Sequence, residues 1–241
     1  MIIPTTKKNM GFTMIELMVS ISIFFITASM ILTNYPAFGT NLAIENLAQD
    51  IALSIRQAQV FGVAIVGAGS GTSQVFNAYG ISFPAPDTTL ASMYKYTIFA
   101  DVPVAGTRSG DLAYNQNSST CGTPVQGDEC LTDYLSNSKR YGVLFLCKDY
   151  YHTDSAATVA GRIRDCMDSS LNYRLNDLGI VFARPQLEVT KFYGTTVLNP
   201  STPIIDVSDV AIIVGTKDAK NMRAIVVWKT GQISVERSIT E

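Results

Sequence analysis

An apolar segment near the start of the chain constrains its fold more than any other feature. Residues 12–33 are apolar or hydroxylated except for Glu16, and Lys7, Lys8 and Gly11 precede them. A helix over this segment extends about 33 Å, because each residue adds about 1.5 Å, and this length crosses the hydrocarbon core of a bilayer. Since lysines beside such a helix stay on the cytoplasmic side, we expect the rest of the protein to lie outside the cytoplasm.

Glu16 is an unusual residue for such a segment. A carboxylate within a membrane-spanning helix costs a few kcal/mol, and it therefore indicates a functional role. An ordinary secretory signal has its small-residue cleavage site after the apolar region, whereas the candidate site here, Gly11-Phe12, lies before it. Cleavage at this bond would remove the basic leader, retain the helix and create a new amine on Phe12.

The sequence KKNMGFTMIELMV of residues 7–19, followed by an apolar run, resembles the class III signal of type IV pilins and type II secretion pseudopilins. In that family an inner-membrane aspartyl prepilin peptidase cuts after the glycine and methylates the new N-terminus. The resemblance implies that Gly11 precedes the cleaved bond, that Phe12 becomes the N-methylated terminus, and that Glu16 is the assembly glutamate.

An electrostatic argument also favours an assembly role for Glu16. In a packed bundle of helices its carboxylate can pair with the Phe12 amine of a neighbouring subunit, so that neither charge is buried alone. Such a pair would also fix the axial register between subunits. The alternative is a plain membrane anchor that carries a stray glutamate.

We predict four parts in the chain: a cleaved basic leader of residues 1–11, a transmembrane and assembly half-helix at 12–35, an amphipathic half-helix at 36–62, and a β-rich extracytoplasmic head at 63–241. Residues 102–140 are rich in Gly, Ser, Thr and Asn and are expected to form a long loop insertion in the head. The predicted fold class is α+β and pilin-like, with a long N-terminal helix packed on an antiparallel β-rich head.

The amphipathic half-helix is predicted from its spacing. Its apolar residues recur at steps of three and four: Ile44, Leu47, Ile51, Ile55 and Ala58. This stripe should pack on a β-sheet. Pro36, followed by Gly39, is expected to kink or interrupt the helix near the membrane surface.

The remainder of the chain contains short apolar segments that are typical of strands, and one polar stretch with a short helix. The predicted strands are Val75–Phe83, Met93–Ala100, Tyr141–Cys147, Leu178–Ala183, Leu187–Tyr193, Ile204–Val207, Val210–Val214, Met222–Trp228 and Gln232–Arg237, and the helix is Ala156–Met167. Residues 46–58, 79–83, 96–101 and 226–234 resemble elements of the H-type minor pseudopilins and T-type minor fimbrial pilins.

Composition limits both function and compartment. Removal of residues 1–11 takes two of the 18 basic residues and no acid, which leaves 16 against 20 and a formal net charge of −4. A generic nucleic-acid binder usually has a basic surplus. Four cysteines in an exported chain permit two disulfides with three connectivities. Proximity in the sequence favours Cys121 with Cys130 and Cys147 with Cys166; the alternative is two buried free thiols.

No catalytic or metal signature stands out. His152 is the single histidine, and without a second histidine or a C-x-x-C pair we interpret it as a surface residue rather than a zinc ligand. The acids Asp101, Asp111, Asp128 and Glu129 could contribute to a calcium site, because some major pseudopilins, which this sequence resembles, bind calcium in a loop. Their spacing fits no calcium-loop motif, so we predict solvated acids, no metal and no cofactor.

The sequence therefore predicts a structural subunit, minor rather than major, of a type IV pilus or a type II secretion pseudopilus, and not an enzyme. Its expected partners are prepilin peptidase, other pilin or pseudopilin subunits and the inner membrane; it would later lie in the filament or at the cell surface. One alternative is a DNA-binding minor pilin for DNA uptake, based on five basic residues: Lys217, Lys220, Arg223, Lys229 and Arg237. Another is a membrane-tethered extracellular binding protein or enzyme.

Overall fold

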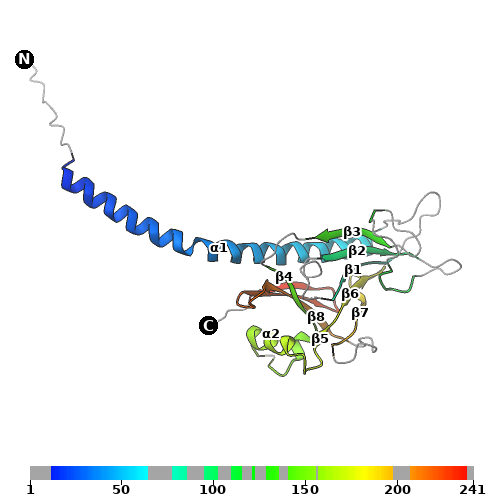
Figure 1. Cartoon of the computed structure of the whole chain (residues 1–241). Coiled ribbons are helices and arrows are strands. Elements are labelled where there is room, and N and C mark those ends of the chain that lie inside the picture. Colours follow the sequence, from blue (N-terminus) through cyan, green and yellow to red (C-terminus); the bar gives the residue numbers. More distant parts are fainter. Residues whose placement is uncertain are drawn as a thin grey trace, which may run out of the picture. The chain divides into compact units, whose positions relative to one another are not determined.

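The structure, a computed structural model, describes residues 12–64, 78–85, 95–102, 110–115, 121–122, 129–135, 141–155, 157–197 and 207–237, with the backbone alone at 33–37 and 135. The chain forms two units, Met1–Leu42 and Ala43–Glu241. Helix α1, Met14–Val63, contributes to both units (Figure 1).

The first unit contains the start of α1. Among the described residues, Met14–Leu32 is the one segment long and apolar enough to cross a membrane, and none of it is buried within the chain. The hydroxyls of Ser20, Ser22 and Thr27 donate to backbone carbonyls one turn earlier, at 2.8–3.0 Å. These polar groups are therefore satisfied inside the helix, as a hydrocarbon environment requires.

The expected interruption of α1 is not observed: the described backbone is helical through Pro36 and Gly39. A proline removes one backbone donor from a helix, and the hydrogen bonds of the flanking turns can maintain the helical conformation on both sides of it. The two predicted half-helices thus belong to one helical element.

The second unit begins with the amphipathic part of α1, and the predicted apolar stripe is confirmed at four positions. Ile44, Ile51, Ile55 and Ala58 are fully buried, and they pack in a core that includes strands of both sheets. Ala48 is also fully buried, while Leu47 lies only partly within the core.

The first sheet is antiparallel, with the order β3-β2-β1-β6-β7. Its strands are β1 Ala78–Phe83, β2 Lys95–Asp101, β3 Cys130–Leu135, β6 Leu178–Phe182 and β7 Val189–Tyr193. At its centre Ile81 lies opposite Ile98 on one side and Ile180 on the other. These three side chains face the core beneath α1.

The second sheet has the order β10-β9-β8-β4-β5 and is also antiparallel. Its strands are β4 Tyr141–Lys148, β5 Arg174–Leu175, β8 Asp209–Thr216, β9 Met222–Trp228 and β10 Ile233–Arg237. Strand β8 is buried on both faces, because Ile212 belongs to the core under α1 and Ile213 to a second core on the opposite face. This explains its uninterrupted apolar run.

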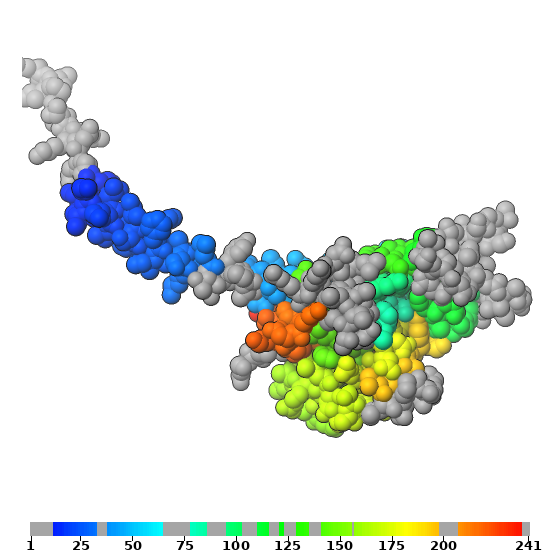
Figure 2. Space-filling model, in the orientation of Figure 1, coloured from blue at the N-terminus to red at the C-terminus, as the bar shows by residue number. Residues whose placement is uncertain are grey.

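Helix α2, Val159–Met167, covers that second core. Thr158 caps its start by accepting a hydrogen bond from the Gly161 N–H at 3.0 Å, and Ile163 and Cys166 are buried against the sheet. A short 3-10 helix, η2 Tyr150–His152, precedes it. Figure 2 shows the region of α2, in yellow-green, at the surface of this unit.

The α+β class with an antiparallel β-rich head is confirmed, but the strand predictions need three corrections. The stretch 102–140 is not wholly a loop, because Cys130–Leu135 pairs with β2 as an edge strand. Strand β5 was not predicted, and residue 207 is not in a strand. Residues 75–77, 93–94, 156 and 204–206 lie outside the described part, so the predicted starts of two strands and of the helix, and most of the predicted strand 204–207, are not tested.

Replacement of Ile55 by alanine should destabilise the second unit by about 2–5 kcal/mol, because a fully buried side chain would leave a cavity under the sheets. Leu53→Ala is the matched control, since Leu53 lies on the same helix with 65% of its surface exposed. Leu53→Ala should lower the free energy of unfolding by less than about 1 kcal/mol. Thermal unfolding of the full chain in detergent measures both, and equal losses would contradict the assigned packing.

Candidate functional site

The start of α1 carries the predicted site residues that the structure describes. The Thr13 hydroxyl accepts a hydrogen bond from the Glu16 N–H at 3.3 Å, and the Thr13 carbonyl accepts one from the Leu17 N–H at 3.1 Å. Thr13 therefore caps the helix, and the sequence T-x-x-E could have predicted this cap. Phe12 precedes the cap with 79% of its surface exposed. Gly11 lies outside the described residues.

Glu16 lies in the first turn of α1, where a carboxylate interacts favourably with the helix dipole. Its side chain is exposed, and it forms no ion pair with any other residue that the structure describes. The carboxylate therefore stabilises the start of the helix, and it is exposed so that a positive group of another molecule can pair with it.

The surface around Glu16 is almost entirely apolar. Large side chains from Phe12 to Leu32 are at least 46% exposed: Phe12, Met14, Ile15, Leu17, Met18, Val19, Ile21, Ile23, Phe24, Phe25, Ile26, Met30, Ile31 and Leu32. An apolar surface this large on a protein marks contact with a membrane or with other proteins. The segment can bury itself in lipid or against like helices.

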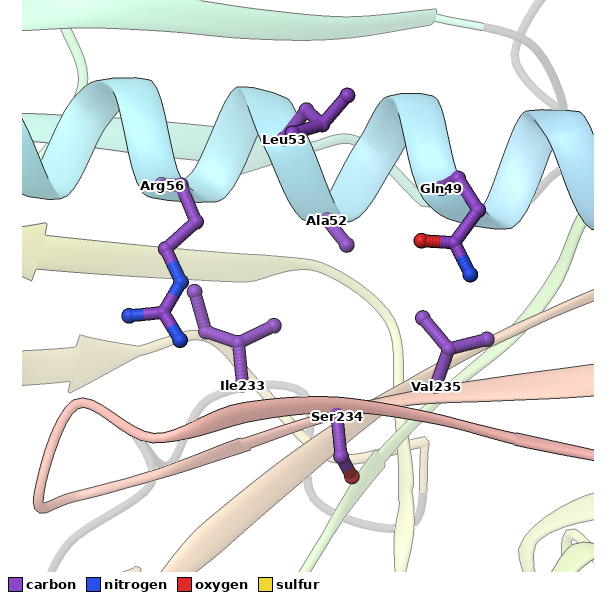
Figure 3. A pocket seen from close by; sticks show the side chains of 7 residues that line it. All are labelled: Gln49, Ala52, Leu53, Arg56, Ile233, Ser234 and Val235. Carbon is purple, nitrogen blue, oxygen red and sulfur yellow. The ribbon is translucent and has the colours of Figure 1, made fainter.

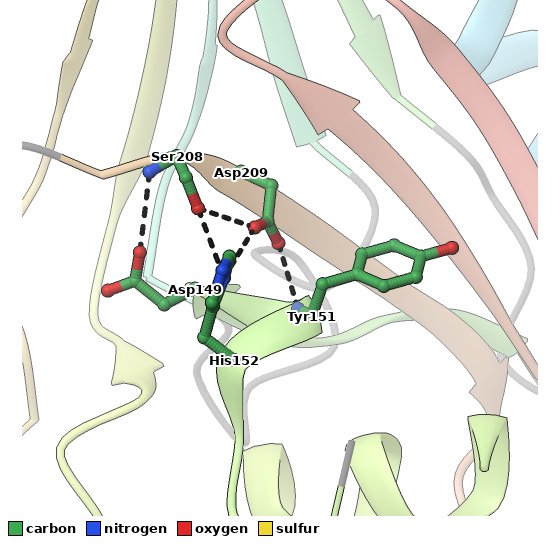
Figure 4. Close-up of polar contacts among 5 residues, drawn as sticks. All are labelled: Asp149, Tyr151, His152, Ser208 and Asp209. Atoms are coloured by element: carbon green, nitrogen blue, oxygen red, sulfur yellow. Dashed lines mark hydrogen bonds and ion pairs between the residues drawn. The ribbon is translucent and has the colours of Figure 1, made fainter. Parts of the chain in front are cut away.

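His152 lies in a polar cluster with Ser208 and Asp209 that resembles a catalytic triad only in composition (Figure 4). Both partners approach the same ring nitrogen: Ser208 Oγ lies 3.2 Å and Asp209 Oδ1 3.4 Å from His152 Nδ1. The Ser208 hydroxyl donates to Asp209 at 2.8 Å. In a triad the two partners occupy opposite ring nitrogens, so this arrangement does not activate the serine.

The same cluster anchors η2 to β8. Asp209 is 1% exposed and accepts a hydrogen bond from the Tyr151 N–H at 3.1 Å, while the Asp149 carboxylate accepts one from the Ser208 N–H at 3.4 Å. His152 itself is mostly exposed, in agreement with the surface position predicted from the sequence. The cluster is structural.

The prediction of solvated acids is wrong for two residues. Asp101 and Glu129 are 1% and 2% exposed, and with Asp111 they place one carboxylate oxygen each within 4.8 Å of the others. Burial raises the pKa of the Glu129 carboxyl to about 7 and raises the pKa of Asp101 above its usual value. Asp128 lies outside the described residues. Sequence spacing does not reveal this cluster, because Asp101 and Glu129 lie far apart in the chain.

The free energy of unfolding should fall as the pH rises from about 4.5 to about 7. A chelator is kept in the buffer so that metal ions do not bind these carboxylates. The pKa of Glu129 is raised from 4.5 to about 7, so in this interval the unfolded chain loses a proton that the folded protein retains. The loss from this group is on the order of 3 kcal/mol. Glu129→Gln should flatten this part of the curve in urea titrations at several pH values; an unchanged slope would contradict the assignment.

The five basic residues do not form one stripe. Arg223 is 5% exposed and its Nε lies 2.7 Å from a carboxylate oxygen of Glu45 on α1, which holds the pKa of Glu45 below its usual value. Lys220 lies 3.8 Å from Asp218 in the same turn. The structure therefore removes Arg223 from any phosphate-binding surface and partly neutralises Lys220.

A groove of about 300 Å³ lies between α1 and β10. Ala52, Gln49 and Arg56 extend from the helix toward Ile233 and Val235 (Figure 3). Among the described lining residues the one ionisable side chain is Arg56, whose guanidinium donates to the side-chain amide oxygen (Oε1) of Gln59 at 3.0 Å. The described lining therefore shows one charged side chain and no pair of convergent titratable groups, the usual signature of a catalytic pocket.

Both cysteine pairs expected from proximity are brought together. Cys121 and Cys130 have Cα atoms 4.9 Å apart, and Cys147 and Cys166 have theirs 5.8 Å apart; each pair forms a disulfide. The first ties residue 121 to the start of β3, and the second ties β4 to α2. Disulfides of this kind persist in oxidising compartments.

Comparison with known proteins concerns the N-terminal segment. Residues 6–32 match the family model described as the prokaryotic N-terminal methylation motif. The match includes the Gly11-Phe12 bond and Glu16, supports a type IV pilin-like or pseudopilin-like protein, and points to a structural rather than a catalytic role. No curated protein and no solved structure matches the chain.

Proposed function

We propose that this protein is a structural subunit, of the minor kind, of a type IV pilus or a type II secretion pseudopilus. A prepilin peptidase cuts between Gly11 and Phe12 and methylates the Phe12 amine. The observation that carries the proposal is the exposed apolar surface of Met14–Leu32, which directly follows the cleavage site within the matched motif.

Cleavage would leave the start of α1 intact. The two hydrogen bonds that begin the helix are accepted by Thr13, and both lie after the bond that is cut. The new amine on Phe12 would then lie one turn before Glu16, about 6 Å along the helix axis. A neighbouring helix shifted by about one turn could place its amine against this carboxylate and neutralise both charges.

The head would lie outside the cytoplasm. Its two disulfides require an oxidising compartment, and the lysines before the apolar segment favour the same orientation. Before assembly the subunit would therefore cross the inner membrane once. After assembly it would belong to a pilus, a pseudopilus or the cell surface, with other subunits as partners through α1.

The minor role rests on the resemblance of residues 46–58, 79–83, 96–101 and 226–234 to the H-type and T-type subunits. A DNA-binding minor pilin is less well supported, because Arg223 is buried in an ion pair. A tethered enzyme is less well supported because the groove beside α1 carries one charged residue.

Shearing of filaments from the host cells tests the proposal. Antibody against the head should detect a small amount of the protein in sheared filaments or in the overexpressed pseudopilus, together with a more abundant subunit. This signal should disappear in cells that lack prepilin peptidase. A protein that stays entirely in the membrane fraction while other subunits are recovered in filaments would contradict it.

A further inference from the structure

We propose that the head binds one divalent metal cation, with Ca²⁺ preferred, through the carboxylates of Asp101, Asp111 and Glu129. This site lies where β2 ends, between residues 110–115 and the start of β3. The proposal does not depend on prepilin processing, since it concerns the second unit alone.

The geometry of the oxygens suits a hard cation. One oxygen from each carboxylate lies within 4.8 Å of the other two. Calcium binds oxygen at about 2.3–2.6 Å, so two of its ligands on opposite sides are about 5 Å apart at most. Three carboxylate oxygens gathered in this range are close enough to share one ion after small side-chain adjustments, and the ion can complete its coordination with water.

An orphaned oxygen of Asp101 points to the ligand independently. Asp101 is 1% exposed, and its Oδ1 atom is buried without a well-aligned hydrogen bond from a described residue, although the nearby Asp111 N–H helps to lower the pKa of this carboxyl. Its other oxygen accepts a hydrogen bond from the Leu112 N–H at 3.2 Å. A buried carboxylate oxygen without a donor costs free energy, and a cation would supply the missing positive partner.

The local charge balance favours a cation as well. Lys191 is the neighbouring positive group; its ammonium donates to the Asp111 carbonyl at 3.1 Å and lowers the pKa of Asp101. This single positive charge is outnumbered by the three carboxylates of the cluster. The N–H groups of Val102 and Asn115 donate to the two oxygens of Glu129 at 3.0 and 2.9 Å, which fixes this side chain in place.

Close packing holds Asp101 in its position. A Cβ added to Gly110 would collide with the Asp101 carboxylate, so only a glycine allows the backbone to lie directly on it. Glu129 is adjacent to Cys130, which the disulfide to Cys121 fixes. A bound cation would thus join three segments that are separate in the sequence, and it should stabilise this edge of the first sheet.

The test uses the full-length protein in nonionic detergent after removal of metals with EDTA and dialysis. Isothermal titration with CaCl₂ should show one saturable site with a dissociation constant of about 10⁻⁴ M or below, and MgCl₂ should bind more weakly. Asp111→Asn and Glu129→Gln should each weaken calcium binding by about tenfold or more, since each removes one charged ligand. Calcium should raise the melting temperature of the wild type and not of these variants.

Asp218→Asn is the matched control, because Asp218 is an exposed acid in a turn of the other sheet and its loss changes the net charge equally. It should bind calcium as the wild type does. If Glu129→Gln fails to fold, the calcium affinity of Asp111→Asn tests the proposal instead. Asp111 is exposed, so its replacement should not disturb the fold. Absence of saturable binding at millimolar calcium, or equal affinity in Asp111→Asn and Asp218→Asn, would overturn the proposal.

Discussion

Replacement of Gly11 by valine should leave nearly all of the protein uncleaved. A peptidase that cuts after a small residue must accommodate the side chain before the scissile bond, and valine adds a branched group where glycine has none. The precursor would keep Lys7 and Lys8, and its N-terminus would remain on the cytoplasmic side. The measurement is the ratio of precursor to mature chain on a gel after co-expression with a prepilin peptidase.

Gly39→Val is the control for this experiment. Gly39 lies in α1, and a Cβ added there meets no other atom within 4 Å, so the same substitution should leave cleavage unaffected. If Gly11→Val were processed to the same extent as Gly39→Val, the Gly11-Phe12 bond would not be the cleavage site.

Replacement of Glu16 by alanine should leave cleavage intact and remove the protein from assembled filaments. The Phe12 amine of a neighbouring subunit would then be buried without a partner, at a cost of about 3–5 kcal/mol for each such contact. Incorporation should therefore fall by tenfold or more. The amount of mature protein in sheared filaments, relative to that in membranes, measures the effect.

Two further variants separate the charge of Glu16 from its place at the helix start. Glu16→Gln removes the charge and keeps a residue that suits a capping box, while Thr13→Ala removes the cap and keeps the charge. The assembly role predicts that Glu16→Gln fails to incorporate and that Thr13→Ala incorporates. The reverse result would assign Glu16 to helix capping and contradict the assembly role.

The sequence predicted the features that depend on local periodicity. The stripe of Ile44, Ile51 and Ile55 was predicted because helical spacing alone brings these residues to one face. The central strands β1, β8 and β9 were predicted because their apolar runs are bounded by polar turns. In the same way the N-terminal motif is a contiguous pattern, and residues 6–32 match its family model.

The features that sequence did not predict depend on distant pairing. Strand β3 lies in a stretch rich in Gly, Ser and Asn, and it becomes a strand because it pairs with β2, which lies much earlier in the chain. Asp101 and Glu129 were predicted to be solvated because acids beside loops usually are. Asp101 is covered by Gly110 and Leu112 at the end of β2, and Glu129 is held by the N–H groups of Val102 and Asn115. No local pattern encodes these contacts.

The mass and N-terminal chemistry of the protein recovered from membranes or sheared filaments test the central claim most directly. The account predicts a chain that begins at Phe12 with an N-methylated amine, and it predicts the full-length precursor in cells without prepilin peptidase. A chain that retains Met1 while the peptidase is active would contradict this account. The protein would then be a head on a membrane anchor, and no Phe12 amine would exist to pair with Glu16.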